Sequence, residues 1–439
     1  MKHYFLIGSA VMTQCVGAEL SARERPNIIF VLTDDLGYSD LGCYGNPVIK
    51  TPFLDSLASE GVQALNYVVT SPSSTPSRAS LLTGRYASRL ALPEPIGPGS
   101  ERGLADEETT IAEMLKGKGY KTAMVGKWHL GDKQPFHHPN KQGFDSYFGM
   151  LYSHDYRHPY VKTDTTIKIF RDRKPEIIRP EDSILTKTYT QEAINFVQAQ
   201  NSDNPFFLYL AYNMPHLPVV FAASAKRLQA KVEESGELGA VVSEMDDCLR
   251  QLWKAVKDIG AEENTIFMFS SDNGPWIEYP DRMASDGHTR PWHVGAAGVF
   301  RGSKATTYEG GVRVPFIVYW KDKLKGNIVS EPISNLDVLP TIAEWVNAPL
   351  PARPLDGESI AERLENKAID SPHRPIFLVN HGKPEAVKYG EWKYRVIASN
   401  TGKQVELFNL NADPSERSNL VDELPEKTKE MEAIFQSFD

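Results

Sequence analysis

The stretch "PNIIFVLTDD", residues 26–35, joins a continuous apolar run to two acidic residues. Residues 27–32 form an unbroken β-prone run, which is typical of a strand buried on both faces of a parallel sheet. Asp34 and Asp35 follow where that strand ends. The stretch therefore predicts a central strand that carries polar chemistry at its carboxyl end.

Outward from this strand, apolar strands and amphipathic helices alternate along the chain. Residues 121–131, 205–218 and 264–274 each begin as a buried strand and end in a polar loop. The alternation predicts an α/β fold, in which a large, mostly parallel sheet lies between two layers of helices. Ligands of such sheets bind beyond the carboxyl ends of the strands. Helices are expected at 52–60, 109–120, 189–200, 237–260 and 335–347, and a further strand at 314–320.

A Pro-rich stretch, "APLPARPLDGES" at 348–359, indicates a boundary. We expect one large domain over residues 26–350 and a small subdomain over residues 370–439. The small subdomain is predicted to be an antiparallel sheet with one helix, because short strands separated by turn residues precede a helical segment. Those strands are expected at 375–380, 385–390, 391–398 and 405–410, and the helix at 425–438.

The first residues resemble an export signal. Lys2 precedes an apolar run at 4–16, and small residues follow at 16–18. This pattern predicts a signal peptide over residues 1–18 and a periplasmic location, with a lipid anchor on Cys15 as the minor alternative. The run is too short to span a bilayer, which takes about 20 residues, and we expect no membrane span elsewhere.

The overall charge excludes some partners. A net charge of −9 argues against nucleic acid or an anionic membrane surface as the main partner. Beyond the expected signal only Cys43 and Cys248 remain, so the chain is no disulfide framework. An anionic substrate would have to be recognised by a local cluster of cations or by a metal.

Oxygen donors recur at two strand ends. Asp34 and Asp35 follow one strand, and Asp272 and Asn273 follow another. Four oxygen ligands without a soft donor suit a hard divalent cation, Ca²⁺ or, as the alternative, Mg²⁺. The other interpretation is that these are solvated turn residues.

The stretch "SPSSTPSRASLLTGRY", residues 71–86, places a cation where a helix begins. Hydroxyl residues and Pro explain a helix N-terminus, but Arg78 in its first turn opposes the helix dipole. An anion is therefore expected nearby. The residues that would complete a site for a tetrahedral anion are Arg78, Lys127, His129, His216 and Lys304.

Several blocks together resemble the sulfatase family. Residues 74–84 match its signature, (Cys or Ser)-x-Pro-Ser-Arg-x-x-x-Leu-Thr-Gly, without a mismatch, and residues 119–131 resemble its second signature. Residues 271–274, 302–315 and 407–420 resemble later blocks of the family. The resemblance is to the arylsulfatase A and N-acetylgalactosamine-6-sulfatase branch, and it implies the alkaline-phosphatase-like fold.

The resemblance implies a modified nucleophile and a metal. Ser74 stands where the family oxidises Cys or Ser to formylglycine, whose hydrate attacks sulfur. A Ser at this position points to an anaerobic, radical-type maturing enzyme, and so to an anaerobic bacterium, and the alternative is an engineered Cys→Ser variant. The ligands of Ca²⁺ would be Asp34, Asp35, Asp272 and Asn273, together with the modified Ser74.

The resemblance also assigns the cations and histidines. Arg78 would steady the formylglycine, while Lys127, Lys304 and His216 would neutralise the sulfuryl oxygens. His216 or Lys304 would protonate the leaving oxygen, and His129 would accept the proton of the second diol hydroxyl.

The substrate is expected to be a sulfated glycan with a galactose or N-acetylgalactosamine unit, such as a glycosaminoglycan-like or mucin oligosaccharide. Two loops with surplus polar groups supply the candidate contacts Asp155, His158, His288 and Arg290. Two alternatives remain open. One is a metal-dependent phosphatase or phosphodiesterase that uses Ser74 directly, and the other is a catalytically inactive glycan-binding relative.

Overall fold

The computed structural model describes residues 25–162, 165–201, 204–369, 371–399 and 402–438. The export signal expected at 1–18, with Cys15, lies outside the described residues. Within them, no helix combines the length and the apolar character that crossing a bilayer requires.

The centre of the large sheet is parallel, as predicted. β1 (Asn27–Thr33) lies between β9 (Thr265–Ser271) and β8 (Phe206–Ala211) and pairs in parallel with both. β4 (Lys121–Gly126) and β5 (Ser146–Gly149) continue the parallel part beyond β8. The outer strands are β10 (Phe316–Trp320), β2 (Val62–Ala64) and β11 (Asn327–Val329) on one side, and β6 (Lys168–Arg171) and β7 (Lys174–Ile178) on the other.

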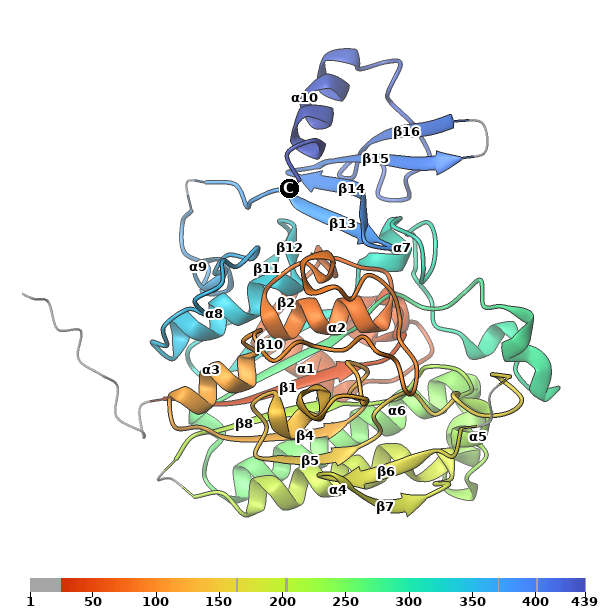
Figure 1. Ribbon diagram of the computed structural model, residues 1–439, viewed down its shortest axis with the longest axis vertical. Coiled ribbons are helices and arrows are strands. Elements are labelled where there is room, and N and C mark those ends of the chain that lie inside the picture. The colour runs from red at the N-terminus through yellow and green to blue at the C-terminus, as the bar shows by residue number, and fades with distance from the viewer. Residues whose placement is uncertain (1–24, 163–164, 202–203, 370, 400–401, 439) are drawn as a thin grey trace, which may run out of the picture.

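Helices cover both faces of this sheet (Figure 1). Ile28, Phe30 and Leu32 of β1 belong to one core, and Ile29 and Val31 belong to the other, because successive side chains of a strand point to opposite faces. The first core includes α2 (Ser74–Thr83), α3 (Ile111–Gly117) and α8 (Val338–Trp345), and the second includes α1 (Pro52–Glu60), α4 (Leu185–Gln198) and α6 (Gln229–Asp258). The predicted sandwich is confirmed.

Some local features differ from the expectation. The strand expected at 314–320 is present as β10 but runs antiparallel to β9. The hairpin of β6 and β7 was not predicted, because its strands are short and mostly exposed at the edge of the sheet. α6 begins eight residues earlier than expected, at Gln229 instead of residue 237, and Gly236 interrupts its helical backbone with a φ of 70°.

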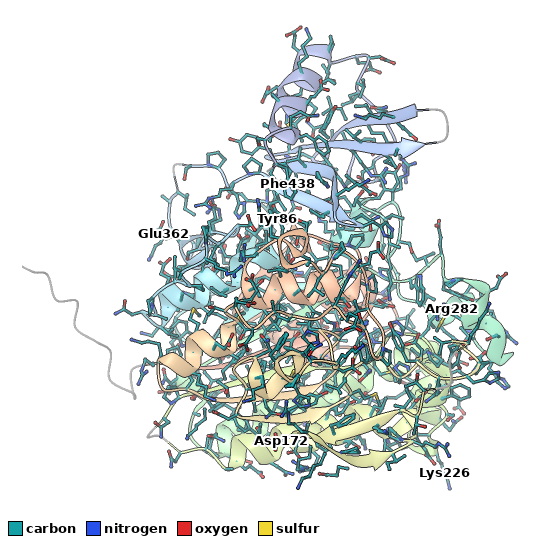
Figure 2. The ribbon with its side chains drawn as sticks, in the orientation of Figure 1. Tyr86, Asp172, Lys226, Arg282, Glu362 and Phe438 are labelled. Carbon is teal, nitrogen blue, oxygen red and sulfur yellow. The ribbon has the colours of Figure 1, made fainter. Side chains whose placement is uncertain are left out.

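The C-terminal part is an antiparallel sheet with one helix, as predicted. It consists of β13 (Ile376–Asn380), β14 (Lys383–Tyr389), β15 (Trp392–Ser399) and β16 (Gly402–Asn409), and of α10 (Pro425–Phe435). Met431 of α10 packs into the core of this sheet. Phe438 and Tyr86, both labelled in Figure 2, meet edge to face at 5.2 Å between ring centroids. The small sheet is therefore packed against the main body.

Candidate active site

The carboxyl ends of neighbouring strands bring the predicted polar residues together. Asp34 and Asp35 follow β1, Asp272 follows β9, and Lys127 follows β4. Asp272 continues the pairing of the strands, because its amide donates to the carbonyl of Thr33 at 3.1 Å. All these side chains are buried. The sheet thus gathers residues that are more than 200 positions apart in sequence.

Ser74 lies at the first position of α2 and faces this cluster. Its Oγ donates to Asp272 Oδ2 at 2.6 Å and lies 3.3 Å from the Lys127 ammonium. One turn later, Arg78 donates to the same Asp272 oxygen from Nε at 3.0 Å, and its Nη2 lies 3.6 Å from Asp34. Burial lowers the pKa of the Arg78 guanidinium, but the carboxylates of Asp272 and Asp34 outweigh burial and raise it. The cation at this helix start therefore has two anionic partners.

Two lysines hold the remaining carboxylates. Lys127 Nζ donates to Asp34 Oδ2 at 2.6 Å, and Lys304 Nζ lies 2.8 Å from Asp35 Oδ1. Burial lowers the pKa of Lys127, and the charge of Arg78 adds to this effect. Burial also raises the pKa of Asp35. The cluster thus contains three carboxylates and three cations, so its charges balance before any substrate or metal is bound.

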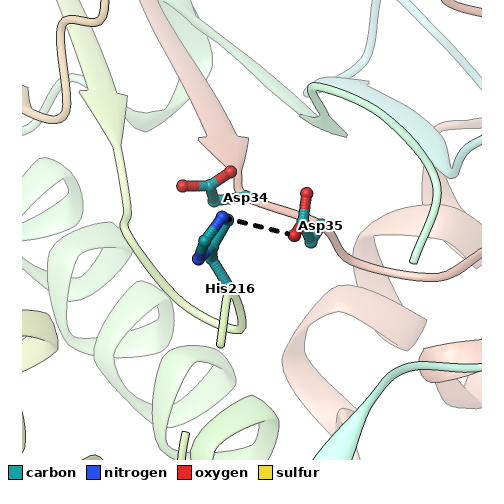
Figure 3. A group of neighbouring side chains, drawn as sticks. All are labelled: Asp34, Asp35 and His216. Atoms are coloured by element: carbon teal, nitrogen blue, oxygen red, sulfur yellow. Dashed lines mark ion pairs between the residues drawn. The ribbon is translucent and has the colours of Figure 1, made fainter. Parts of the chain in front are cut away.

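The donor set fits a divalent cation. Asn273 donates through Nδ2 to Asp35 Oδ1 at 2.7 Å, whereas its buried Oδ1 has no hydrogen-bond donor in the described part of the chain. An orphaned amide oxygen beside carboxylates is a suitable ligand for a hard cation. Asp34, Asp35 and His216 each offer one ligand atom, and these atoms lie within 4.8 Å of one another (Figure 3). The geometry thus places His216 beside the carboxylates of this candidate metal site.

The tautomers of two histidines follow from their carbonyl partners. His129 Nε2 lies 2.9 Å from the Ile96 carbonyl, and His216 Nδ1 lies 2.6 Å from the Leu217 carbonyl. Because a carbonyl only accepts, these nitrogens carry the protons. Across the described residues, His129 Nδ1 is buried without a partner and presents a lone pair. Burial lowers the pKa of both imidazoles well below the usual value. Both rings are therefore neutral, with one nitrogen ready to accept.

The backbone is strained at three positions of the site. Asp35, His129 and Ala305 have φ values of 63°, 62° and 71°, in the left-handed region that side chains other than glycine rarely adopt. Such conformations cost about 1–3 kcal/mol each and persist where the surroundings hold them. All three positions lie at the site, because Asp35 follows β1, His129 follows β4 and Ala305 is next to Lys304.

Only one of the four predicted substrate contacts lies against the charged cluster. Asp155 is 3% exposed, and its Oδ1 is 4.0 Å from His216 Nδ1 and has no hydrogen-bond partner among the described residues. His158, His288 and Arg290 are exposed. Arg290 donates to the carbonyls of Thr289 and Gly287 in its own loop, and the ring of His288 contacts Phe221.

The sequence analysis missed two residues beside Asp155. The Trp276 ring centroid lies 4.3 Å from Lys304 Nζ and 5.3 Å from the Arg282 guanidinium. Arg282 lies 3.6 Å from Asp155 Oδ2, on a projecting loop (Figure 2). Trp276 could have been identified as an aromatic residue three positions after Asn273. Arg282 offered no such signal, because it lies in a short 3₁₀ helix, Asp281–Asp286, within the long segment between β9 and β10.

Comparisons with known proteins agree with this geometry. The family model "Sulfatase" matches residues 26–348, and the model "N-sulphoglucosamine sulphohydrolase, C-terminal" matches residues 295–437. Arylsulfatase A of Homo sapiens is 33% identical, covering 92% of this chain and 85% of its own. N-acetylgalactosamine-6-sulfatase of Sus scrofa is 32% identical, covering 89% and 74%. The structure of Ps i-CgsB in complex with k-i-k-neocarrahexaose has a TM-score of 0.76 at 29% identity, covering 94% and 92%.

Proposed function

The chain belongs to the sulfatase family and is a sulfuric ester hydrolase, and from this premise we propose that it removes O-sulfate from a galactose or N-acetylgalactosamine unit of a sulfated saccharide. The observation that carries the proposal is the Ser74 hydroxyl, held among three carboxylates and three cations at the edge of the sheet. A relative named N-acetylgalactosamine-6-sulfatase and a neighbouring structure with a bound oligosaccharide support the substrate class.

Ser74 is the residue that we propose is converted to formylglycine, which sulfatases generally use together with a divalent metal. The hydrated group supplies two hydroxyls, one to attack sulfur and one to lose a proton so that sulfate leaves. The chain's own residues orient this group. Arg78 and Lys127 surround it, and the amino end of α2 adds partial positive charge.

The metal that we propose is Ca²⁺, held by Asp34, Asp35, Asp272 and Asn273. The carboxylate oxygens of this group and the Asn273 Oδ1, which has no hydrogen-bond donor among the described residues, support this set of ligands. Such an ion supplies Lewis-acid stabilisation of charge on the sulfuryl oxygens. His216 Nε2 carries no proton in the tautomer described above, so it can join the ligands or accept a hydrogen bond from the substrate.

Proton transfer is assigned to two residues. His129 Nδ1, with its buried lone pair, accepts the proton when sulfate is released. Lys304 donates to the leaving oxygen of the sugar. Burial lowers the pKa of its ammonium, but the Asp35 carboxylate outweighs burial and raises it, so Lys304 carries a proton to give. Lys127 and Lys304 together compensate charge on the sulfuryl oxygens.

We further propose an oxygen-independent maturing enzyme as the partner that modifies Ser74, because a Ser replaces the more common Cys. Residues 1–18 support export to the periplasm. Asp155, buried beside His216, is the saccharide contact that the geometry favours over His158, His288 and Arg290.

Neither alternative function is favoured. A phosphatase of the same superfamily would use a second cation with additional Asp and His ligands, whereas Lys127 and Lys304 supply positive charge at 2.6 and 2.8 Å from Asp34 and Asp35. A glycan-binding protein without activity needs neither a buried base such as His129 nor a nucleophile. This arrangement supports our proposal of a hydrolase with one metal.

The test begins with the mass of the peptide that contains Ser74, after co-production with an anaerobic maturing enzyme. We expect a peptide lighter by two hydrogens, and sulfate release from galacto-configured sugar sulfates that Ser74→Ala abolishes. An unmodified Ser74 in active protein would overturn the nucleophile. Sulfate release from glucosamine or uronic acid sulfates alone would overturn the substrate.

A further inference from the structure

Residues 301–309, here called the Lys304 loop, connect the two sides of the catalytic centre. The Lys304 amide donates to the Pro275 carbonyl at 2.9 Å, near Asn273. The next amide, that of Ala305, donates to the Pro72 carbonyl at 2.8 Å, two residues before Ser74. The loop therefore sets the position of Lys304 relative to both the nucleophile and the metal ligands.

The C-terminal sheet holds this loop through buried polar contacts. Asn380, at the end of β13, donates through Nδ2 to the Ala305 carbonyl at 3.2 Å. Thr307 is fully buried, and its hydroxyl donates to Glu385 at 2.9 Å while accepting from Arg395 Nε at 2.9 Å. Residues of three strands, β13, β14 and β15, thus fix the backbone directly after Lys304.

The C-terminal sheet also contacts the other end of the Lys304 loop, at Tyr308. The Tyr308 ring lies between two guanidinium groups, with its centroid 3.6 Å from Arg395 and 4.0 Å from Arg301. Its hydroxyl lies 3.1 Å from the Glu406 carboxylate. Structural stability of the small sheet alone would not require contacts with a loop that carries a catalytic residue.

We propose that the C-terminal sheet is a positioning element of the catalytic centre, in which Asn380, Glu385 and Arg395 set the place of the Lys304 ammonium. The inference rests on the acid role proposed for Lys304. The three residues do not touch the reacting atoms, and they act through the backbone of residues 305–307. A displacement of about 1 Å at a reacting group lowers a rate by about a hundredfold, so small shifts of this loop are costly.

The test is a double-mutant cycle between Asn380→Ala and Lys304→Ala in the matured enzyme. We expect Asn380→Ala to lower kcat by about tenfold to a hundredfold, with KM changed far less. In the Lys304→Ala background, Asn380→Ala should lower kcat no further. Loss by the same factor in both backgrounds, or a kcat of Asn380→Ala within twofold of the wild type, would overturn the inference.

The matched control is Asn419→Ala. Asn419 is also an amide of the small subdomain, but it bonds the backbone of Leu407 and Val405 in β16 instead of the Lys304 loop. We expect its kcat to stay at the wild-type value, whatever its effect on thermal stability. If Asn419→Ala lowers kcat as much as Asn380→Ala, the effect is a general loss of the subdomain and the inference fails.

A second readout does not depend on the substrate. The Lys304 side chain is only 10% exposed and is paired with Asp35, so an amine reagent such as acetic anhydride should label it slowly. Asn380→Ala should speed the labelling of the Lys304 peptide severalfold, and Asn419→Ala should not. Unchanged labelling contradicts the inference. Inactivity of wild-type enzyme towards every galacto-configured sulfate, with faster labelling, would contradict the proposed substrate while supporting the positioning role.

Discussion

Replacing Glu309 by Gln should destabilise the protein strongly. Glu309 opens α7 (Glu309–Val312), and its fully buried carboxylate binds Lys388 at 2.7 Å and Lys393 at 3.0 Å. Arg313 adds a third contact at 3.3 Å. Both lysines are fully buried and come from the C-terminal sheet. The carboxylate therefore joins the small sheet to the main body.

The size of the loss in the free energy of unfolding follows from the hydrogen-bond partners that each lysine retains in the variant. Lys393 retains Glu416 at 2.7 Å, whereas Lys388 retains, among the described residues, the neutral Asn66 Oδ1 at 2.9 Å. Burial already lowers the pKa of Lys388 to about 8. Without the Glu309 carboxylate, Lys388 would lose its proton at pH 7. Deprotonating a lysine of ordinary pKa at pH 7 costs roughly 5 kcal/mol. That ceiling agrees with the 3–5 kcal/mol typical of a broken buried ion pair, so we expect a loss of about 4 kcal/mol.

The assay is equilibrium unfolding in urea at pH 7, followed by far-UV circular dichroism, for the wild type and Glu309→Gln. The matched control is Glu262→Gln. Glu262 also has two lysine partners, Lys257 at 3.1 Å and Lys321 at 3.3 Å, but its side chain is 23% exposed. We expect a loss below about 1 kcal/mol there. A loss below 1 kcal/mol for Glu309→Gln as well would refute the reasoning that the buried network joins the two parts.

Three further predictions concern the metal, a histidine and a helix cap. Chelation should abolish sulfate release by the matured enzyme, and added Ca²⁺ should restore it; activity that survives exhaustive chelation would contradict the metal. Burial lowers the pKa of His373, but the Asp337 carboxylate at 2.9 Å outweighs burial and raises this pKa, so the pair stabilises the fold fully below pH 6.5 and less as the pH rises through the raised pKa. His373→Gln should therefore lower the free energy of unfolding more at pH 5.5 than at pH 9. An equal loss at both pH values would contradict this role of the pair. Asp246 accepts from the amides of Phe53 and Leu54, so Asp246→Ala should cost about 2 kcal/mol in urea unfolding; a cost near zero would show that water replaces the cap.

The charged cluster could be predicted from sequence because the signal is local and the topology is simple. Each of Asp34, Lys127 and Asp272 lies within three residues of the end of an apolar run. The carboxyl ends of parallel strands lie at one edge of the sheet, so residues that follow such runs can be predicted to lie close together even when the order of the strands is unknown. The orientation of β10 was not predictable in this way, since an apolar run carries no information about direction.

The surroundings of Asp155 were less predictable, because they are built from loops and short 3₁₀ helices instead of strand ends. His288 and Arg290 had the right chemistry, but the loop turns both to solvent, whereas Arg282, in the same loop, reaches Asp155. Met283 of this segment packs with Tyr160 and Leu217, and such long-range contacts are not encoded in a local pattern. Composition identified this segment but could not identify which of its residues contacts Asp155.

The buried network around Glu309 shows why charge is hard to place from sequence. Lys388, Lys393 and Glu416 have the composition of surface residues, yet all three are fully buried. A buried charge is tolerated only when its partners are buried with it, so such residues must occur in closed sets. Here the set spans β14, β15, α7 and the segment after β16. No single one of these segments can bury its charge unpaired, so we expect the small sheet and the Lys304 loop to become ordered together, and Lys304 to be fixed only when the C-terminal sheet has formed.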